Sequence, residues 1–286
     1  MQKIQQLIEN SDTPIVSIVV LTYNHEHYIT KCLQSILAQN TQYQVELIIY
    51  DDASTDNTVK VIEQLIPTKS KNIKKIYSEI NKFSQGKKPK SPELITNHVT
   101  GKFFTIVDGD DYWEGDYYRV EKMIAALMND QDASFSFSDV KKFNNGNNDK
   151  FSEHLPERNK RDFPVHDLKR LNYAYIHLGA TFFRNVPVKF PEEFFLQFNG
   201  DTWFPILWGE FGYGKFIPNC GFLAYRINEK GMWSSQNEQE KEINRTIFAC
   251  QMTSYLLKKG YVDAAIYQAH RFNPIMLAHQ RAVKSA

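Results

Sequence analysis

The chain of 286 residues has few cysteines, almost no net charge and no long apolar run. Its three cysteines, Cys32, Cys220 and Cys250, lie far apart and form no CxxC pair. This spacing excludes a disulfide framework and a cysteine zinc ribbon, and it fits a reducing compartment. The 34 basic residues nearly balance the 33 acidic ones, so no basic excess indicates nonspecific binding to nucleic acid.

Targeting signals are equally scarce. No stretch approaches the roughly 18 consecutive apolar residues of a membrane-spanning helix. The N-terminal residues MQKIQQLIENSD are polar and lack the apolar core of a signal peptide. We therefore expect a cytoplasmic protein that binds no nucleic acid.

What the sequence does contain is a regular alternation of strand and helix patterns. Nearly continuous apolar runs, rich in β-branched residues, predict buried strands at 15–21, 45–50, 73–78 and 103–107. Amphipathic helical patterns lie between them. This alternation predicts an α/β fold with a Rossmann-like, mostly parallel sheet flanked by helices.

Changes of pattern along the chain divide it into three predicted parts. Residues 1–140 form the regular α/β half, and residues 141–235 are more aromatic and less periodic. Residues 236–286 carry helical patterns. The polar, turn-rich stretch 144–162 is typical of a surface excursion near the first boundary.

Polar and acidic side chains follow three of the predicted parallel strands. They are Thr22-Tyr23-Asn24 after the first strand, Asp51-Asp52 after the second, and Asp108-Gly109-Asp110-Asp111 after the fourth. Because the carboxyl ends of parallel strands form the ligand crevice of an open α/β sheet, these segments should gather at one edge. Clustered carboxylates repel one another unless a cation or hydrogen-bond donors lie among them. Oxygen-only ligands favour Mg²⁺ or Mn²⁺.

A purely structural explanation competes with this functional one. Aspartate is common in turns and at helix N-caps, and that explanation applies best to Asp56, which precedes a predicted helix. It applies less well to the acids around Gly109, which follow an apolar strand directly. Asp201, which opens an aromatic helical pattern, could be a helix cap or a functional carboxylate.

Several segments resemble a known family. PIVSIVVLTYN, ELIIYDDASTDNT and GKFFTIVDGDDYW, within about 14–128, resemble the nucleotide-binding half of family 2 glycosyltransferases, which have the GT-A fold. Downstream, NGDTWFPILWGEFGYGKFIP and AYRINEKGMWS resemble the acceptor half of bacterial non-processive members. The resemblance implies that residues 1–140 bind a nucleotide sugar and that 141–235 bind the acceptor.

The resemblance also implies an activity and its participants. The expected reaction is the inverting transfer of a sugar from a nucleoside-diphosphate sugar, with a UDP-sugar favoured, to a hydroxyl of a glycan or lipid-linked acceptor. Polysaccharide biosynthesis is the implied setting. Asp201 matches the position of the family's catalytic base, which takes the proton of the attacking hydroxyl.

The donor site implied by the resemblance combines most of the residues already singled out. Its expected nucleotide-sugar-binding members are Thr22, Tyr23, Asn24, Asp51, Asp52, Asp108, Gly109, Asp110 and Arg226. Asp108 and Asp110 match the family's DxD pair, and Asp111 extends it. These three acids are the expected ligands of Mn²⁺ or Mg²⁺, with Asp110 foremost. Asn228 stands where relatives often carry histidine, which weakens the expected metal site.

Other interpretations of the same residues stay open. Asp108 and Asp110 also fit a magnesium phosphohydrolase of the haloacid-dehalogenase type, although such a motif usually opens its domain. Asn228 also leaves room for a non-catalytic sugar-nucleotide binder. Glu192, Glu193 and Glu210 are rival bases.

Aromatic and basic residues of the sequence carry weaker functional signals. Trp203, Trp208 and Trp233 could stack on sugars, although such aromatics are more often core residues. The lysine-rich stretch 69–90 and the basic tail after Asp263 could make a peripheral contact at the inner face of the membrane, or could be solvated. His25 and His27 lack the third ligand of a zinc site.

Overall fold

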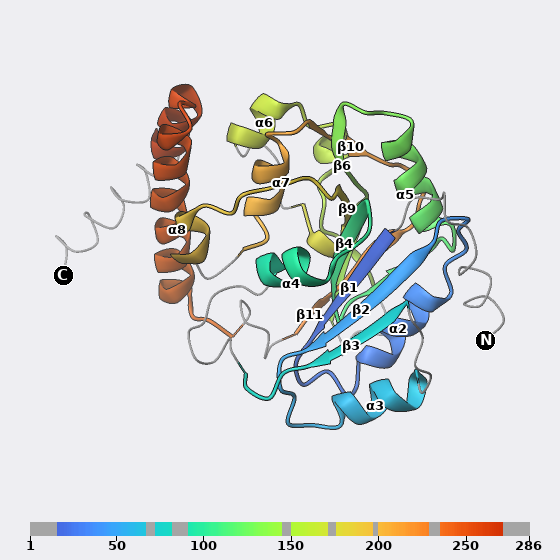
Figure 1. Ribbon diagram of the computed structural model, residues 1–286. Coiled ribbons are helices and arrows are strands. Elements are labelled where there is room, and N and C mark those ends of the chain that lie inside the picture. The colour runs from blue at the N-terminus through green and yellow to red at the C-terminus, as the bar shows by residue number, and fades with distance from the viewer. Residues whose placement is uncertain are drawn as a thin grey trace.

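The computed structural model describes most of the chain. The described residues are 16–66, 72–81, 91–144, 150–170, 176–196, 200–228 and 235–270. They form two sheets and the helices that cover them (Figure 1).

The main sheet has seven strands in the order β10-β6-β9-β4-β1-β2-β3. Its strands are β1 (Val16–Thr22), β2 (Val45–Asp51), β3 (Ile73–Tyr77), β4 (Phe103–Asp108), β6 (Ala133–Phe137), β9 (Thr181–Arg184) and β10 (Tyr213–Phe216). The pairs β1–β2, β1–β4, β2–β3 and β6–β10 are parallel. Only β9 runs antiparallel to its neighbours β4 and β6. The predicted mostly parallel sheet is therefore confirmed.

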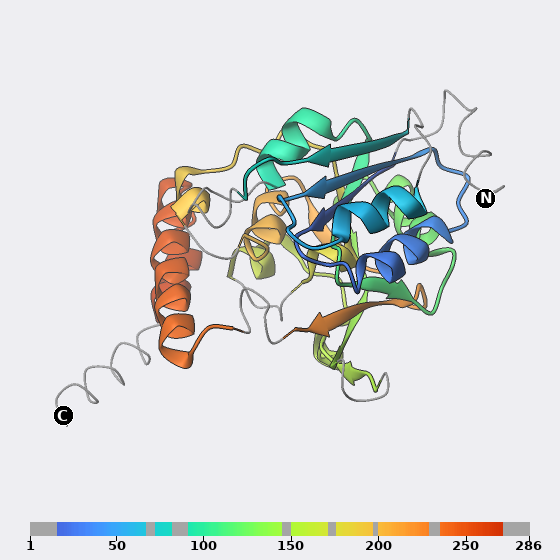
Figure 2. The ribbon, with the colours of Figure 1, turned by 90° about the horizontal axis from the view of Figure 1, so that it is seen from below.

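Helices cover both faces of this sheet (Figure 2). On one face lie α2 (Ile29–Leu37), α3 (Thr58–Leu65) and α5 (Arg119–Met128), and on the other α4 (Ser91–His98) and α7 (Trp203–Trp208). Helix α8 (Glu238–Lys258) packs on the outer side of α7, where the rings of Tyr255 and Trp203 lie 5.3 Å apart. Along β1, Ile18 and Val20 pack toward the first layer, while Val19 packs toward the second. This alternation gives a strand buried on both faces, as its continuous apolar sequence predicts.

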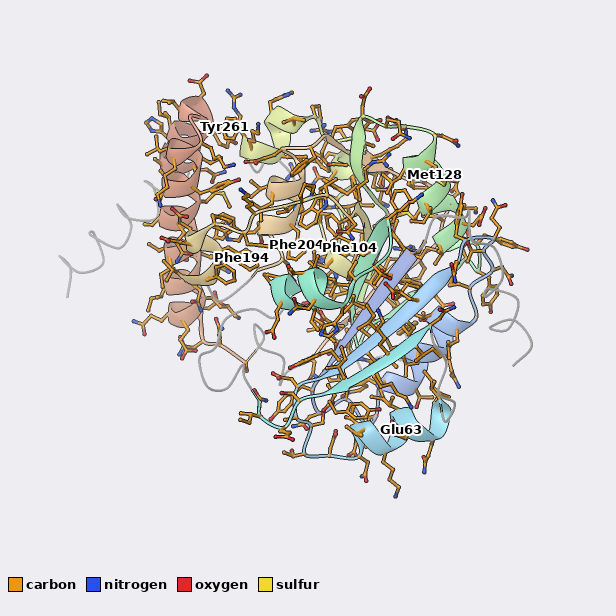
Figure 3. All side chains as sticks on the ribbon, in the orientation of Figure 1. Glu63, Phe104, Met128, Phe194, Phe204 and Tyr261 are labelled. Carbon is orange, nitrogen blue, oxygen red and sulfur yellow. The ribbon has the colours of Figure 1, made fainter. Side chains whose placement is uncertain are left out.

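The second layer is unusually aromatic. Phe104 of β4 stacks on Phe183 of β9 at a ring-centroid distance of 5.4 Å, and Trp208 of α7 lies 5.5 Å away. Phe104 and Phe204 lie near each other at the centre of the molecule, as labelled in Figure 3. The second half of the chain therefore shares its core with the parallel sheet instead of forming a separate one.

A smaller sheet stands at one side of the main one. Its four strands, in the order β5-β11-β7-β8, are β5 (Tyr112–Glu114), β11 (Phe222–Ile227), β7 (Asp139–Asn144) and β8 (Ser152–Glu153). Strand β5 follows directly on the acidic turn after β4, and it pairs with the distant strand β11. This pairing brings the second half of the chain to the end of β4.

The remaining described elements are short, apart from α8. They are η2 (Glu157–Asn159), α6 (Val165–Arg170), η3 (Leu178–Ala180) and η4 (Glu192–Leu196), with a further helical stretch at 262–270. Helix α8 begins with a capping box. The Asn237 side chain accepts a hydrogen bond from the Glu240 backbone amide, and the Glu240 side chain accepts one from the Asn237 backbone amide. In the described part of the chain, every helix is too short or too polar to span a bilayer.

The first prediction concerns the core shared by both halves. Phe104→Ala should lower the free energy of unfolding by about 3–5 kcal/mol, because it leaves a cavity among aromatic rings. Ile243→Ala, on the exposed face of α8, should change it by less than about 0.5 kcal/mol. Urea denaturation measures both values. Similar midpoints for the two variants would contradict a core centred on Phe104.

Candidate active site

The parallel register brings three of the predicted segments to one edge of the main sheet. Thr22 pairs with Asp51 across β1 and β2, and Leu21 pairs with Asp108 across β1 and β4. The Gly109 amide donates to the Leu21 carbonyl at 2.7 Å, so this pairing continues into the acidic turn. The strand ends therefore meet as the topology predicts.

The first two turns are fastened to each other by side chains. The Asn24 carboxamide oxygen accepts from the Thr55 amide at 2.8 Å, and the Ser54 hydroxyl accepts from the Asn24 amide at 2.8 Å. Both carboxylate oxygens of Asp51 accept hydrogen bonds from Ser54. Asn24 has a φ of 55°, a left-handed conformation that asparagine tolerates better than most residues. Asn24 and Asp51 thus shape the rim of the crevice.

The structural explanation holds for Asp56. Its carboxylate accepts from the Thr58 amide at 2.9 Å and from the Glu26 amide at 3.1 Å. The N-cap residue of α3 is Asn57, which makes no side-chain cap bond. Asp56 therefore joins the turn after β1 to the start of α3.

The acidic turn after β4 requires its glycine. A Cβ on Gly109 would lie 2.9 Å from Nδ1 of His25, 3.0 Å from Cδ1 of Ile29 and 3.0 Å from Cβ of Thr22. Real Cβ atoms scarcely ever approach other atoms so closely, so a side chain here would push the turn away from β1. Glycine thus allows Asp108 and Asp110 to lie against the end of β1.

Asp110 and Asp111 lie in different surroundings. The side chain of Asp110 is 17% exposed, and its carboxylate lies 3.9 Å from Nε2 of His25. Asp111 is 1% exposed, and its Oδ1 accepts from the Arg226 amide at 2.9 Å. Arg226 in turn donates from Nε to the Asp110 carbonyl at 2.9 Å. Strand β11 is therefore hydrogen-bonded to both Asp110 and Asp111.

The Arg226 side chain is held between two aromatic rings. Its guanidinium carbon lies 4.4 Å from the ring centre of Tyr28 and 4.6 Å from that of Phe143. Such stacking suits the planar guanidinium. The cation therefore has a fixed place beside the acidic turn.

The charge of Asp201 acts on the same group of acids. Burial raises the pKa of Asp108 well above its usual value, and the charges of Asp201 and Asp110 raise it further. Burial also raises the pKa of Tyr225, with further contributions from these acids and Asp111. Asp201, two residues before α7, thus lies within electrostatic range of an acidic turn at least 90 residues earlier in the sequence.

The acidic cluster has the chemistry of a cation site. Ligand atoms of Asp108, Asp111 and His177 all lie within 4.8 Å of one another. Burial raises the pKa of Asp111, and Asp110 and Asp108 raise it further. Oδ2 of Asp111 is buried and makes no hydrogen bond to any described residue. These carboxylates fit a divalent ion, whose charge would offset both their burial and their mutual repulsion.

His177, which lies directly before η3 and is 2% exposed, carries no functional signal in the sequence. Its segment reads IHLGATFF, in which nothing links the histidine to acids some 66 residues earlier. The sequence alone marks His25 only as half of a pair with His27. The structure instead places His25 beside Asp110, whereas the His27 side chain is 79% exposed.

Two of the three tryptophans proposed for sugar stacking are core residues. Trp203 and Trp208 are 0% and 1% exposed and pack among the aromatic rings of the second layer. The stacking hypothesis is therefore wrong for both, because their ring faces are covered by protein. Trp233 lies outside the described residues.

Two of the rival bases, Glu193 and Glu210, have their carboxylates bound to residues of α8 and its C-terminal end. Glu193 accepts from Ser254 and pairs with Lys258, so it fastens η4 to α8. Glu210 accepts from Tyr255 at 2.6 Å and pairs with Lys259. Both carboxylates hold α8 in place. The third rival, Glu192, is exposed at the start of η4. Of these acids and Asp201, it is Asp201 whose charge raises the pKa of Asp108.

Most of the basic segments considered for a membrane contact fall outside the described residues, namely 67–71, 82–90 and 271–286. Within the described part, Lys74 pairs with Glu46 and Lys75 pairs with Glu63. These two lysines are therefore engaged in ion pairs within the protein and give no support to a membrane contact.

Fold and site together define a class. A mostly parallel sheet, helices on both faces and an acidic turn at the carboxyl end of a central strand are those of a GT-A-type α/β protein. The chain belongs to glycosyl transferase family 2, whose sequence model matches residues 17–189. The expected family and fold are confirmed.

Curated relatives match the chain over part of their length. The uncharacterized protein Rv1520 of Mycobacterium tuberculosis is 30% identical over 173 residues, which cover 60% of this chain and 47% of that protein. The putative glycosyltransferase EpsE of Bacillus subtilis is 35% identical over 114 residues, which cover 40% and 38%. The chain thus matches half or less of each of these relatives.

Solved structures share the fold. A Staphylococcus aureus TarS fragment in complex with UDP-GlcNAc has a TM-score of 0.57 and 23% identity, covering 82% of this chain and 66% of that one. The mannosyltransferase PcManGT of Pyrobaculum calidifontis, in complex with GDP-Man and Mn²⁺, has a TM-score of 0.57 and 15% identity, covering 100% and 87%.

The second prediction tests the close packing at Gly109. Gly109→Ala should lower the free energy of unfolding by about 1–3 kcal/mol, because the added methyl group overpacks the junction with β1. Combining it with Ile29→Val removes one of the three close contacts. The double variant should therefore lose less than the sum of the two single variants in urea denaturation. Strict additivity would show that Ile29 does not limit the space at Gly109.

Proposed function

We propose that the chain is an inverting glycosyltransferase that moves a sugar from a nucleoside-diphosphate sugar to a hydroxyl of a glycan or lipid-linked acceptor. The observation that carries the proposal is the meeting of three parts of the chain. The acidic turn ends β4 at the carboxyl edge of the parallel sheet, Arg226 of β11 is hydrogen-bonded to it, and the charge of Asp201 reaches Asp108. Open α/β sheets bind their ligands at this edge.

A nucleotide sugar is the donor that the family supports. TarS has been solved with UDP and with UDP-GlcNAc, and PcManGT with GDP-Man. We favour a UDP-sugar for this chain. In the proposal, Thr22, Tyr23, Asn24, Asp51 and Asp52 line the base and ribose. The buried hydroxyl of Thr22 makes no hydrogen bond within the described residues, which leaves it a partner for a ligand.

Asp201 acts as the base in the proposed reaction. Its carboxylate takes the proton of the acceptor hydroxyl while that oxygen attacks the anomeric carbon of the donor. The new C–O bond forms as the bond from that carbon to the diphosphate oxygen breaks, and the nucleoside diphosphate leaves with the bonding electrons. A single displacement inverts the anomeric centre and needs no protein nucleophile.

The acidic turn carries the cofactor in the proposal. Asp108, Asp110 and Asp111 would hold Mn²⁺ or Mg²⁺, which supplies positive charge to the departing diphosphate when bound. Arg226 fixes the Asp110 carbonyl, and its guanidinium offsets part of the negative charge of the turn. Gly109 lets the turn lie flat against β1, which leaves room for the donor's phosphates.

The competing functions differ in what they explain. Membership of a glycosyltransferase family leaves the haloacid-dehalogenase-type phosphohydrolase without support. A non-catalytic sugar-nucleotide binder would keep the donor site and lack turnover. Measured sugar transfer would therefore rule it out, and donor binding without transfer would support it. A cytoplasmic location with peripheral contact at the membrane belongs to the proposal because a lipid-linked acceptor would lie there.

The third prediction tests the base. Asp201→Asn should lower turnover by about 10²- to 10⁴-fold, with little change in the KM for the donor, because the amide cannot take a proton. Glu192→Gln is the matched control, since it makes the same acid-to-amide change at an exposed rival acid. Transfer from a panel of nucleotide sugars measures both variants. Parent-like turnover in Asp201→Asn would place the base elsewhere.

The fourth prediction tests the metal ligand. A nucleotide sugar that binds only the native state should raise the thermal midpoint by mass action, and Mn²⁺ should increase that rise. Asp110→Ala should abolish the Mn²⁺-dependent part while the midpoint of the ligand-free protein stays nearly the same. Asp132→Ala, an exposed acid remote from the turn in sequence, should behave like the parent. An undiminished Mn²⁺ effect in Asp110→Ala would remove this residue from the metal site.

A further inference from the structure

Each ring nitrogen of His177 lies close to a residue of the site region. Nδ1 accepts a hydrogen bond from the Gly179 amide at 3.2 Å, which caps the short helix η3. Nε2 faces the Asp111 carboxylate, 3.6 Å from its Oδ2. The ring packs against Tyr225 at a centroid distance of 4.8 Å, and His177 and Asp111 are both almost fully buried.

The Gly179 bond decides which nitrogen carries the proton. A nitrogen that accepts a hydrogen bond has a free lone pair, so Nδ1 is unprotonated. A protonated imidazolium would have N–H groups at both positions, which excludes that form as well. The ring is therefore neutral with its proton on Nε2, the nitrogen that points toward Asp111.

This tautomer separates two possible roles of His177. One ring nitrogen lies close enough to Asp108 and Asp111 to join them around a cation, and Nε2 is the nitrogen that faces Asp111. A protonated Nε2 has no lone pair for a metal, so ligation would require the ring to lose its bond from Gly179 or to give up a further proton. Donation of Nε2–H to a carboxylate requires neither change.

Asp111 needs such a donor. Its Oδ1 accepts from the Arg226 amide at 2.9 Å, whereas its Oδ2 is buried with no hydrogen bond to a described residue. The separation of 3.6 Å from His177 exceeds a hydrogen bond, but a shift of about half an ångström would bring Nε2 and Oδ2 to a normal distance. An unpaired carboxylate oxygen at this depth is costly, which favours the shorter arrangement.

We propose that His177 is a positioning residue, which donates from Nε2 to Asp111 and thereby orients the acidic turn without itself binding the metal. Asp111 then joins three segments, since His177 precedes β9, Arg226 lies in β11 and the turn ends β4. The proposal rests on the proposed function only for the identity of the bound ion. The tautomer of His177 and its contact with Asp111 do not depend on which ion or substrate the protein binds.

Nuclear magnetic resonance tests the tautomer directly. Long-range ¹H–¹⁵N correlation on the full chain labelled with ¹⁵N-histidine distinguishes protonated from unprotonated ring nitrogens. His177→Gln assigns the signal by its loss. We expect a protonated Nε2 and an unprotonated Nδ1 at His177, both without metal and with Mg²⁺. A proton on Nδ1 in either condition would overturn the proposal.

Two matched variants separate the cap from the donor. His177→Asn keeps an acceptor near the Nδ1 position for the Gly179 amide but has nothing at the Nε2 position. His177→Gln keeps an N–H donor near the Nε2 position and loses the cap. If His177 positions Asp111, the asparagine variant should bind Mn²⁺ about 10- to 100-fold more weakly, as for other residues that orient a ligand. The glutamine variant should regain most of that loss.

Titration of free Mn²⁺ by electron paramagnetic resonance measures these affinities without any sugar transfer. Parent-like affinity in His177→Asn would overturn the positioning role, and so would an equal loss in both variants, which would point to the cap. A protein with the expected affinities and no transferase activity would fail only the proposed function. If the parent binds no Mn²⁺, the proposed metal fails and the tautomer alone decides this inference.

Discussion

The site depends on one electrostatic constraint, the concentration of buried carboxylates at the end of a central parallel strand. Burial and mutual repulsion raise the pKa values of Asp108 and Asp111, and Asp201 adds a further negative charge nearby. Such a cluster lowers the stability of the protein unless positive charge or hydrogen-bond donors are brought to it. The surrounding structure can be understood as the means of bringing them.

Strand β11 and η3 supply these compensating groups from the second half of the chain. Arg226 provides a backbone N–H for Asp111 and a guanidinium for the Asp110 carbonyl. Pairing of β11 with β5 holds that arginine in register with the turn, because β5 follows it directly. The antiparallel strand β9 brings His177 to the same place. The two halves therefore share one site as well as one core.

The sequence was sufficient for the features that follow from periodicity and topology. Continuous apolar strands fix a parallel sheet, and a parallel sheet must place Thr22, Asp51 and Asp108 at one edge. It was insufficient where tertiary packing decides. Trp203 has the same composition-based signal whether it faces a sugar or the core, and the aromatic layer buries it completely. His177 could not be paired with Asp111, because the antiparallel insertion of β9 carries no distinct pattern.

The adjacent acids Asp110 and Asp111 have different surroundings because their side chains point in different directions from the turn. Asp110 stays partly exposed beside His25, where a ligand can reach it, whereas Asp111 points inward to Arg226 and His177. An outward carboxylate can exchange water for an ion at little cost, whereas an inward one needs hydrogen-bond donors or a cation beside it. The inward acid therefore fixes the position of the outward one. The two neighbouring acids therefore occupy different places in the site, and the partners of Asp111 come from distant parts of the chain.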